Sequence, residues 1–186
     1  MYFLETDHWI VLSGQDQAFI DEFASRHIAN KYNGIRKDAR NDRTYLKPKD
    51  SIRAGYRAEY AVARYFGLKF NDTFDVNDAL AGDLEYGIEV KTTDNPVGGL
   101  YCSKTKCDLY MKRSPNTPVI GCRTAHWPWV EILGFMYARE LGAFPFNKTN
   151  PRQNSGWLVP PHRLRGVPEL KKLIDHWKKS FPTPEN

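Results

Sequence analysis

Apolar residues recur at helical spacing through the first third of this chain. Across residues 15–29 they repeat every three or four positions, which predicts an amphipathic helix. Ser13 or Asp16 is a suitable N-cap for it, and Asn33-Gly34 supplies the flexible residue that commonly ends a helix. The first helix of the chain is therefore expected to pack one face against a core.

A second helix is predicted from Asp50 or Ser51 to Phe66, with Gly67 ending it. Glu59 lies at the margin of its buried face, where an ion pair with a neighbouring arginine is the plain alternative to a functional role. The stripe is rich in alanine, which permits close packing against a sheet, and consists of Ala54, Ala58, Ala61, Val62, Tyr65 and Phe66.

Beyond Gly67 the dominant period is two, which is typical of strands. Residues 81–93 read as a tight hairpin around Gly87, and residues 142–161 as a long loop. A short helical turn is expected at 138–141, and a closing helix at about 168–180. The other strands are expected at 68–70, 107–111, 119–123 and 129–138, and residues 9–12, before the first helix, are expected to form a short strand or an extended lead-in.

This order of elements predicts an α+β, or mixed α/β, fold with a central mixed sheet flanked by helices. Residues 1–186 are interpreted as a single domain with an N-terminal helical, basic extension over about 1–50. No apolar run reaches the length of a membrane span and no signal peptide is recognised, so we expect no membrane partner and a location in the cytoplasm, that of the host cell if the protein is viral.

Positive charge is concentrated in one region. The chain carries a net charge of +5 and has a pI of about 9.0. Residues 31–69 hold eleven basic and four acidic residues, which gives +7 locally and leaves −2 for the rest. Such a region suits a polyanionic partner such as nucleic acid, and a solubilising surface is an equally open interpretation.

Three cysteines, an odd number, fit a reducing compartment better than a disulfide framework. Together with His126, they have a spacing that a zinc site can use: Cys102, Cys107, Cys122 and His126. Neither half shows the usual two-residue cysteine knuckle. We therefore interpret the cysteines as core residues and expect no zinc.

Charged residues crowd the 81–93 segment. Glu89 and Lys91 share one face of a strand, with Thr93 following them, and Asp83 lies upstream beside a glycine. A solvated hairpin edge with a surface ion pair is the plain interpretation. Two carboxylates beside a lysine also suit a hard divalent cation, because such ions prefer oxygen ligands.

Taken with Glu59, these residues follow the order Glu…Asp-x5-Glu-x-Lys, which resembles the PD-(D/E)XK nuclease superfamily. The resemblance covers roughly residues 50–140, and the later strands are similar to those of small phage nucleases. It implies a restriction-endonuclease-like core: a helix, a three-stranded antiparallel meander, a helix and a further strand. The proline that usually precedes the aspartate is replaced by Gly82. Glu85 matches no motif position.

The resemblance implies a Mg²⁺-dependent deoxyribonuclease, in which Mn²⁺ can substitute. Asp83, Glu89, the Val90 carbonyl and Glu59 would hold the metal, while Lys91 would orient water or stabilise the anionic transition state. The positive charge of the bound metal ion beside Lys91 would disfavour its ammonium form and make a lowered Lys91 pKa possible. The expected nucleic-acid contacts are Arg53, Arg57, Thr93, Lys104 and Lys106.

DNA is the expected partner, double-stranded DNA is favoured, and a homodimer is possible. Two alternatives stay open. The first alternative is a catalytically silent nucleic-acid-binding or phage structural module on the same fold. The second is a resolvase that acts on branched junctions.

Overall fold

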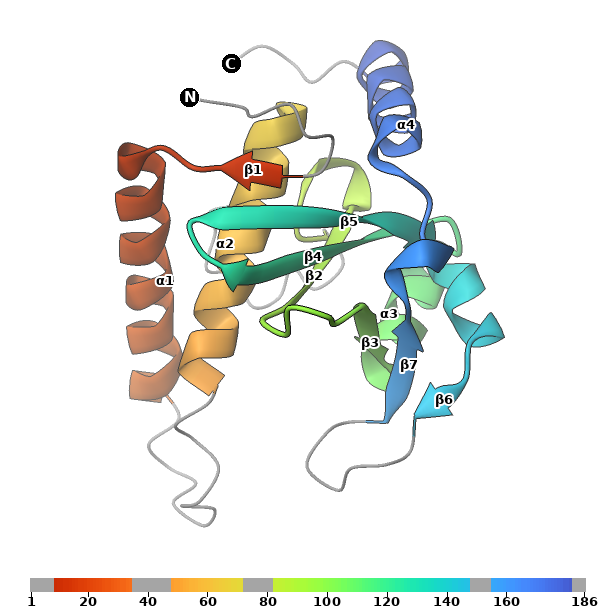
Figure 1. The fold of residues 1–186 in the computed structure, drawn as a ribbon, viewed down its shortest axis with the longest axis horizontal. Coiled ribbons are helices and arrows are strands. Elements are labelled where there is room, and N and C mark those ends of the chain that lie inside the picture. The colour runs from red at the N-terminus through yellow and green to blue at the C-terminus, as the bar shows by residue number, and fades with distance from the viewer. Residues whose placement is uncertain (1–8, 35–47, 72–81, 148–154, 182–186) are drawn as a thin grey trace.

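The structure is a computed structural model that describes residues 9–34, 48–71, 82–147 and 155–181 (Figure 1). Most of the predicted basic loop, residues 35–47, and Ala81 at the start of the predicted hairpin lie outside these ranges. Helices and strands mix in an α+β arrangement, which confirms the predicted fold class.

The main sheet has four strands in the order β1-β5-β4-β2. Its members are β1 (Trp9–Val11), β2 (Glu89–Thr93), β4 (Pro118–His126) and β5 (Trp129–Tyr137). β2 pairs with β4 in parallel, whereas β4 pairs with β5 and β5 with β1 in antiparallel fashion. The sheet is therefore mixed, as predicted, and β2 is its outer strand.

A second, smaller sheet joins three antiparallel strands in the order β3-β7-β6. These are β3 (Leu100–Ser103), β6 (Phe146–Asn147) and β7 (Gly156–Val159). The prediction of one long loop over 142–161 was wrong, because β6 and β7 lie within it. β7 pairs with β3, which lies more than fifty residues upstream, and a local sequence pattern does not reveal such a distant partner. Two 3-10 helices flank this sheet, η2 (Ala138–Ala143) and η3 (Pro161–Arg163).

Four α-helices complete the described fold: α1 (Gly14–Gly34), α2 (Pro48–Phe66), α3 (Lys104–Arg113) and α4 (Val167–Ser180). The predicted first cap is confirmed, since the Asp16 amide donates to Ser13 Oγ at 3.2 Å. α2 begins two residues earlier than expected. It ends where predicted, at Gly67, whose φ of +60° suits glycine.

Residues 107–111, predicted as a strand, lie within α3. Ser103 caps this helix, because its Oγ accepts a hydrogen bond from the Lys106 amide at 3.4 Å. Cys107 and Tyr110, three positions apart, are its buried residues, so helical rather than alternating spacing decides which side chains are inside. The strand expected at 68–70 reduces to a single bridge between Phe70 and Leu84.

The hydrophobic core forms two clusters, one on each face of the main sheet. The first joins the alanine face of α2 and the apolar face of α4 to residues such as Val90 and Ile120. The second joins α3 and β3 to residues such as Val119 and Met136. Because successive strand residues point to opposite faces, β2 contributes Val90 to the first cluster and turns Glu89 and Lys91 toward the second.

The 81–93 segment is not a tight antiparallel hairpin. The amides of Asp83 and Leu84 both donate to the carbonyl of Ile88, at 3.0 and 3.1 Å, around the 3-10 helix η1 (Glu85–Gly87). The chain then enters β2, which pairs with β4. Gly82 has a φ of +87°, which the proline ring cannot adopt, so the loop geometry explains why no proline precedes Asp83.

Candidate active site

The site forms at the edge of β2 that faces away from β4, where no other strand of the described chain pairs with Val90. Its amide donates to Asp83 Oδ2 at 2.8 Å, and its carbonyl accepts from Lys91 Nζ at 2.8 Å. Asp83 therefore occupies the place of a missing strand partner. The η1 turn fixes its position, because it brings the chain back beside β2.

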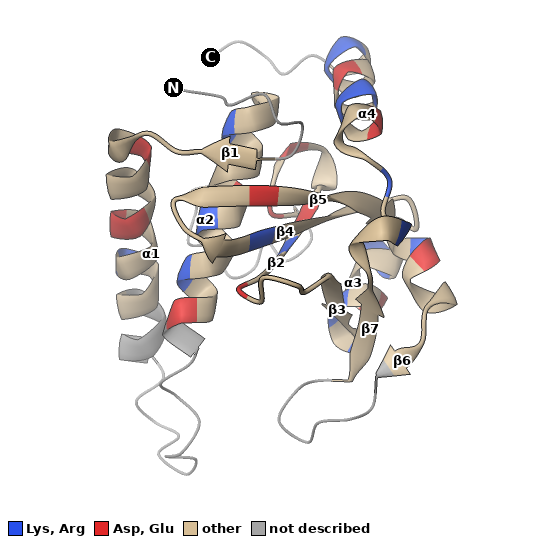
Figure 2. Ribbon diagram, viewed as in Figure 1, with Lys and Arg blue, Asp and Glu red and all other residues tan. Residues whose placement is uncertain are grey.

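Lys91 lies between the two carboxylates of the predicted motif. Its Nζ is 3.5 Å from Asp83 Oδ2 and 3.5 Å from Glu89 Oε2. The Lys91 and Glu89 side chains retain only 22% and 5% of their exposure, so water screens these charges weakly. The structure thus brings Asp83, Glu89 and Lys91 together as the sequence predicted. Acidic and basic positions meet beside β2 on the ribbon (Figure 2).

Glu59 approaches the same cluster from α2. Burial raises the pKa of Glu59 well above its usual range, and the charges of Asp83 and Glu89 add to this, while Lys91 and Lys106 oppose it. The charges of Asp83, Glu89 and Lys91 therefore all act on the Glu59 carboxyl. Burial raises the pKa of Tyr56, one turn earlier, and the charges of Glu59 and Asp83 add to this. Its ring packs on α1, with its centroid 5.1 Å from that of Phe23.

α3 supplies Lys106, which the sequence predicted as a nucleic-acid contact, and two residues that sequence reasoning missed, Tyr110 and Arg113. Lys106, Tyr110 and Arg113 are spaced by four and three positions, which puts them on one helical face. Arg113 Nη2 donates to Glu89 Oε1 at 2.6 Å and to the Gly87 carbonyl at 3.1 Å. The signal for Tyr110 and Arg113 was present as this spacing after the Ser103 cap. A strand assignment hides it, because positions 110 and 113 then face opposite sides.

The buried ring of Tyr110 lies close to both cations of the cluster, Lys91 and Arg113. Its centroid is 5.4 Å from Lys91 Nζ and 5.5 Å from Arg113 Cζ. Burial raises the pKa of the Tyr110 hydroxyl, so it stays protonated at neutral pH. Tyr110 thereby limits how far the Lys91 ammonium can move from the carboxylates.

The lowered Lys91 pKa was expected beside a bound metal ion and stays a prediction. Burial alone would lower the pKa of Lys91, but Asp83, Tyr110 and Glu89 outweigh burial and raise it well above its usual range. Lys91 is therefore an ammonium. Burial and the charge of Asp83 raise the pKa of Glu89 above its usual range. Lys91, Tyr110 and Arg113 act in the opposite direction and offset part of this rise.

The remaining acidic residue of the segment, Glu85, points elsewhere. Its Oε2 accepts from the Lys69 amide at 2.8 Å. This contact ties the η1 turn to the segment that follows α2, so Glu85 has a structural contact outside the charged cluster.

The predicted nucleic-acid contacts fall into two groups. Thr93 lies beside the site, since it follows Lys91 on the same strand face, and Lys106 is exposed on α3, where its charge acts on Glu59. Lys104 pairs with Asp108 at 2.6 Å on the exposed first turn of α3, and Arg53 pairs with Asp50 at 3.7 Å. These two pairs are exposed enough for phosphate to compete with the carboxylates.

Arg57 has a different role from the one expected. It donates to both oxygens of Asp21, at 2.9 and 3.0 Å, and its guanidinium lies 4.1 Å from the centre of the Trp127 ring. These contacts fasten α2 to α1 and to the β4–β5 turn. We therefore leave Arg57 out of the proposed nucleic-acid contacts.

The atoms expected to hold a metal ion are carboxylate and carbonyl oxygens, the ligand type that hard cations prefer. Asp83 Oδ2, Glu89 Oε2 and the Val90 carbonyl converge on one point, and the Lys91 ammonium occupies it. Within the described residues, no group of three or more His, Cys, Asp or Glu side chains is arranged to hold a metal ion. A divalent ion would thus compete with Lys91 for the same oxygens.

The cysteines of the predicted zinc alternative divide between the two core clusters. All three are free thiols and buried, with Cys102 and Cys107 in one core cluster and Cys122 in the other. His126 is exposed at the end of β4, where its ring lies 6.0 Å from that of Trp9.

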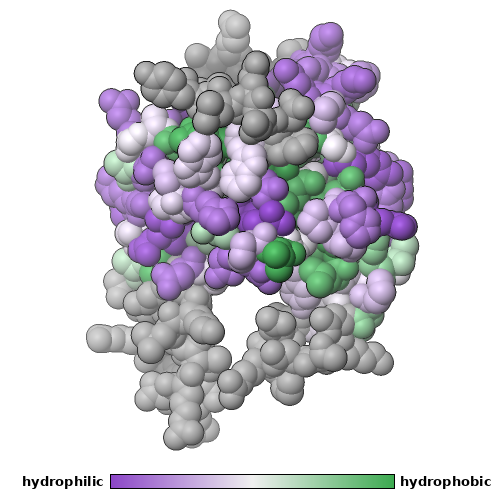
Figure 3. Space-filling view, viewed as in Figure 1, coloured by the Kyte–Doolittle hydropathy of each residue, from purple (hydrophilic) through white to green (hydrophobic). Residues whose placement is uncertain are grey.

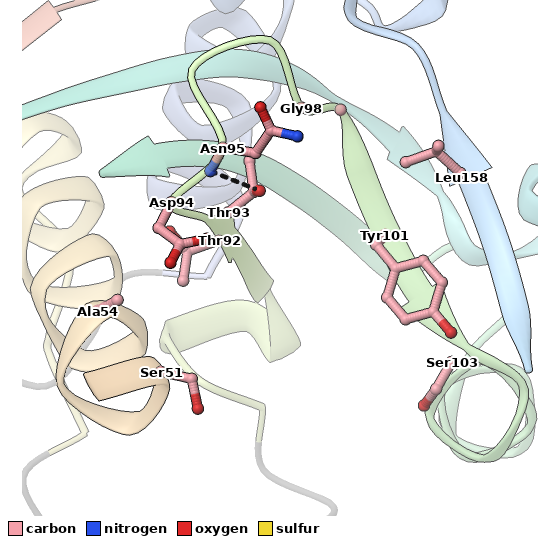
Figure 4. A pocket seen from close by; sticks show the side chains of 11 residues that line it. Ser51, Ala54, Thr92, Thr93, Asp94, Asn95, Gly98, Tyr101, Ser103 and Leu158 are labelled. Atoms are coloured by element: carbon pink, nitrogen blue, oxygen red, sulfur yellow. Dashed lines mark hydrogen bonds between the residues drawn. The ribbon is translucent and has the colours of Figure 1, made fainter. Parts of the chain in front are cut away.

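A cavity of about 510 Å³ opens beside the charged cluster (Figure 4). Ser51 and Ala54 of α2 line one side, Tyr101 of β3 lines the other, and Thr93 lies at the end of β2 between them. The cavity lining therefore begins directly after Lys91 on the same strand, with Thr92 and Thr93.

The chain has no significant match among family models, curated proteins or solved structures. In the part of the chain that the structure describes, no helix is both long enough and apolar enough to cross a membrane.

Proposed function

We propose that this protein is a metal-dependent nuclease that hydrolyses phosphodiester bonds of DNA. The observation that carries the proposal is the position of Lys91, whose ammonium lies 3.5 Å from both motif carboxylates at the outer edge of β2. A buried cation held by two carboxylates provides a fixed positive charge where a phosphate would bind.

The order of elements supports the same proposal. A helix bearing Glu59 precedes Asp83 and β2, and a helix and a strand parallel to β2 follow, in the order that the PD-(D/E)XK resemblance implies. One difference is that β3 pairs with β7 in the second sheet, so the antiparallel meander is not reproduced.

Hydrolysis requires water to add to phosphorus and one P–O ester bond to break, leaving a phosphate monoester and a hydroxyl group. The proton lost by water ends on the departing oxygen. Lys91 stabilises the added negative charge, and Lys106 attracts the neighbouring phosphate. Asp83 and Glu89 orient Lys91, while Arg113 holds Glu89 in place.

Asp83, Glu89, the Val90 carbonyl and Glu59 would hold Mg²⁺, or Mn²⁺ in its place. The bound ion would supply Lewis acidity and a more acidic water. Its binding requires Lys91 to release at least part of its contact with these oxygens.

A second candidate is a nucleic-acid-binding module without catalysis. The observation in its favour is that the Lys91 ammonium fills the point where the described carboxylates converge. Such a module keeps the positive site and the polyanion partner but needs no metal.

Incubation with supercoiled, linear, single-stranded and four-way-junction DNA, in Mg²⁺, Mn²⁺ or EDTA, tests both candidates. We expect cleavage in Mg²⁺ or Mn²⁺ and none in EDTA, and a preference for the junction would identify a resolvase. Lys91→Met and Asp83→Asn should lower the cleavage rate at least 100-fold and leave binding within a few fold. Lys171→Met and Asp175→Asn on exposed positions of α4 are the matched controls.

If the parent protein binds DNA but cuts no substrate in any metal, the binding module replaces the nuclease. If the parent cuts and both site variants cut equally well, the assignment of the site is wrong.

A further inference from the structure

The cavity beside the charged cluster has the size and the lining of a small-molecule site (Figure 4). Its volume of about 510 Å³ falls within the range of roughly 300–1,000 Å³ usual for such sites. It is bounded by α2, by the end of β2 and by β3, so parts of the chain that are far apart in sequence share its walls.

The lining is unsuited to phosphate. Among the described residues that line it, none is Lys or Arg, and the one charged side chain is Asp94. Phosphate binding in proteins relies on cations or on clustered amide donors, and a carboxylate repels it. The lining therefore disfavours an anionic group and suits a neutral group that carries hydrogen-bond donors for Asp94.

One wall suits a flat aromatic group. Tyr101 and Leu158 are cross-strand partners in β3 and β7, so their side chains share a face. Leu158 is 46% exposed, and hydrophobic surface gathers over this second sheet (Figure 3). Ser51 and Ala54 lie across the cavity from the Tyr101 ring. An aromatic ring, a small apolar residue and surrounding hydroxyls match a nucleobase, which has an apolar face and a polar edge.

The cavity lies within one nucleotide's reach of the place proposed for the reacting phosphate. Thr93 lines the cavity and Lys91 lies two residues before it on the same face, about 7 Å away at the rise of a strand. A strand of nucleic acid with its phosphate at Lys91 therefore brings an adjacent base to the cavity.

We propose that this cavity receives one unpaired base next to the phosphate bound at Lys91; the inference rests on the proposed function of that site. A base within a duplex is stacked and paired, so it reaches a pocket only by leaving the helix. The substrate class is therefore nucleic acid with an unpaired nucleotide at the cut, such as a single strand, a frayed end or a branch point.

Binding without cleavage tests this inference. A fluorescent single-stranded 12-mer is titrated in EDTA, and an abasic nucleotide is then placed at each position in turn. For the parent protein we expect one position at which base removal weakens binding about tenfold, since stacking of one base on an aromatic ring is worth about this much. In Tyr101→Ala and in Ala54→Leu, which fills the cavity from α2, the same removal should change affinity less than twofold.

Ala29→Leu is the matched control, because Ala29 is exposed on α1. It should keep the parent's response to the abasic nucleotide. An equal response at every position, no binding of the single strand, or an unchanged response in Ala54→Leu would each overturn the inference.

Cleavage in Mg²⁺ tests the proposed function separately. A base-dependent binding step without any cleavage would keep the cavity and reject the nuclease. If Ala54→Leu cleaves DNA at the parent's rate, and base removal weakens binding equally at every position, the nuclease proposal stands and the base site is rejected.

Discussion

Arg113 shows how a single side chain sets up the site from outside the motif. It holds one oxygen of Glu89 and the Gly87 carbonyl, which leaves the other Glu89 oxygen directed at Lys91. Both members of this ion pair are largely buried, with 13% and 5% of their side-chain exposure left. Removing one partner from such a pair leaves an uncompensated charge in the interior.

Arg113→Met should therefore lower the free energy of unfolding by about 3 kcal/mol, because Glu89 stays buried without its partner. Adding Glu89→Gln to that variant should recover part of the loss, since it removes the unpaired charge. Urea unfolding measures both. Arg26→Met is the control, because Arg26 forms an exposed pair with Glu22 at 3.7 Å and should cost less than about 0.5 kcal/mol. Equal losses for the two single variants would contradict a buried role for the Arg113–Glu89 pair.

Local signals account for the residues that the sequence predicted correctly. Glu89 and Lys91 are two apart, so any strand puts them on one face, and the glycines around Asp83 predicted a turn that returns it to that strand. Arg113 and Tyr110 were missed because their place in the site depends on α3 packing against β2.

At the scale of elements, the η1 turn is the part of the fold that places Asp83. A Cβ on Gly82 would lie 2.8 Å from the Cα and carbonyl carbon of Gly87, and its φ of +87° disfavours any other residue. Two glycine backbones thus pack directly against each other where the chain reverses before β2.

Gly82→Ala is expected to destabilise the protein by about 2 kcal/mol, because it adds both steric overlap and backbone strain. It should also lower the rate of any Mg²⁺-dependent cleavage, since Asp83 shifts with the turn. Gly14→Ala is the comparison, because a Cβ there meets nothing within 4 Å. Urea denaturation and the cleavage assay on both variants provide the measurement; similar stability for the two would show that the turn relaxes without cost.

Whether an element could be predicted from the sequence depends on how far apart along the chain its defining interactions are. α1, α2 and α4 were predictable because caps, glycines and apolar stripes are local. The parallel pairing of β2 with β4 joins residues thirty apart, and β3 with β7 joins residues more than fifty apart. No local pattern specifies such partners, so the sheet order and the small second sheet required the structure.

On the scale of the whole molecule, positive charge is spread over several elements. The chain has a net charge of +5, and basic positions lie along α2 and α4 (Figure 2). Binding of a polyanion by such a surface weakens with salt, because each phosphate contact releases counterions.

Lys106→Ala should reduce the slope of log affinity against log salt by about 0.9 for duplex DNA, the amount lost with one phosphate contact. Lys171→Ala, at an exposed position of α4 outside the site, should leave the slope nearly unchanged. Titrations from 50 to 300 mM salt compare the two variants with the parent. If both substitutions shift the slope equally, DNA binds through overall charge and not through the face of α3.

The hydrogen bonds of Val90 also bear on self-association. Sheets with bare outer strands recruit further chains by backbone pairing, a common route to aggregation. Here the amide and carbonyl of Val90 are occupied by Asp83 and Lys91. The residues proposed for catalysis thus also protect the outer strand from other chains. Variants that remove either side chain should be examined for aggregation before any loss of activity is interpreted as chemistry.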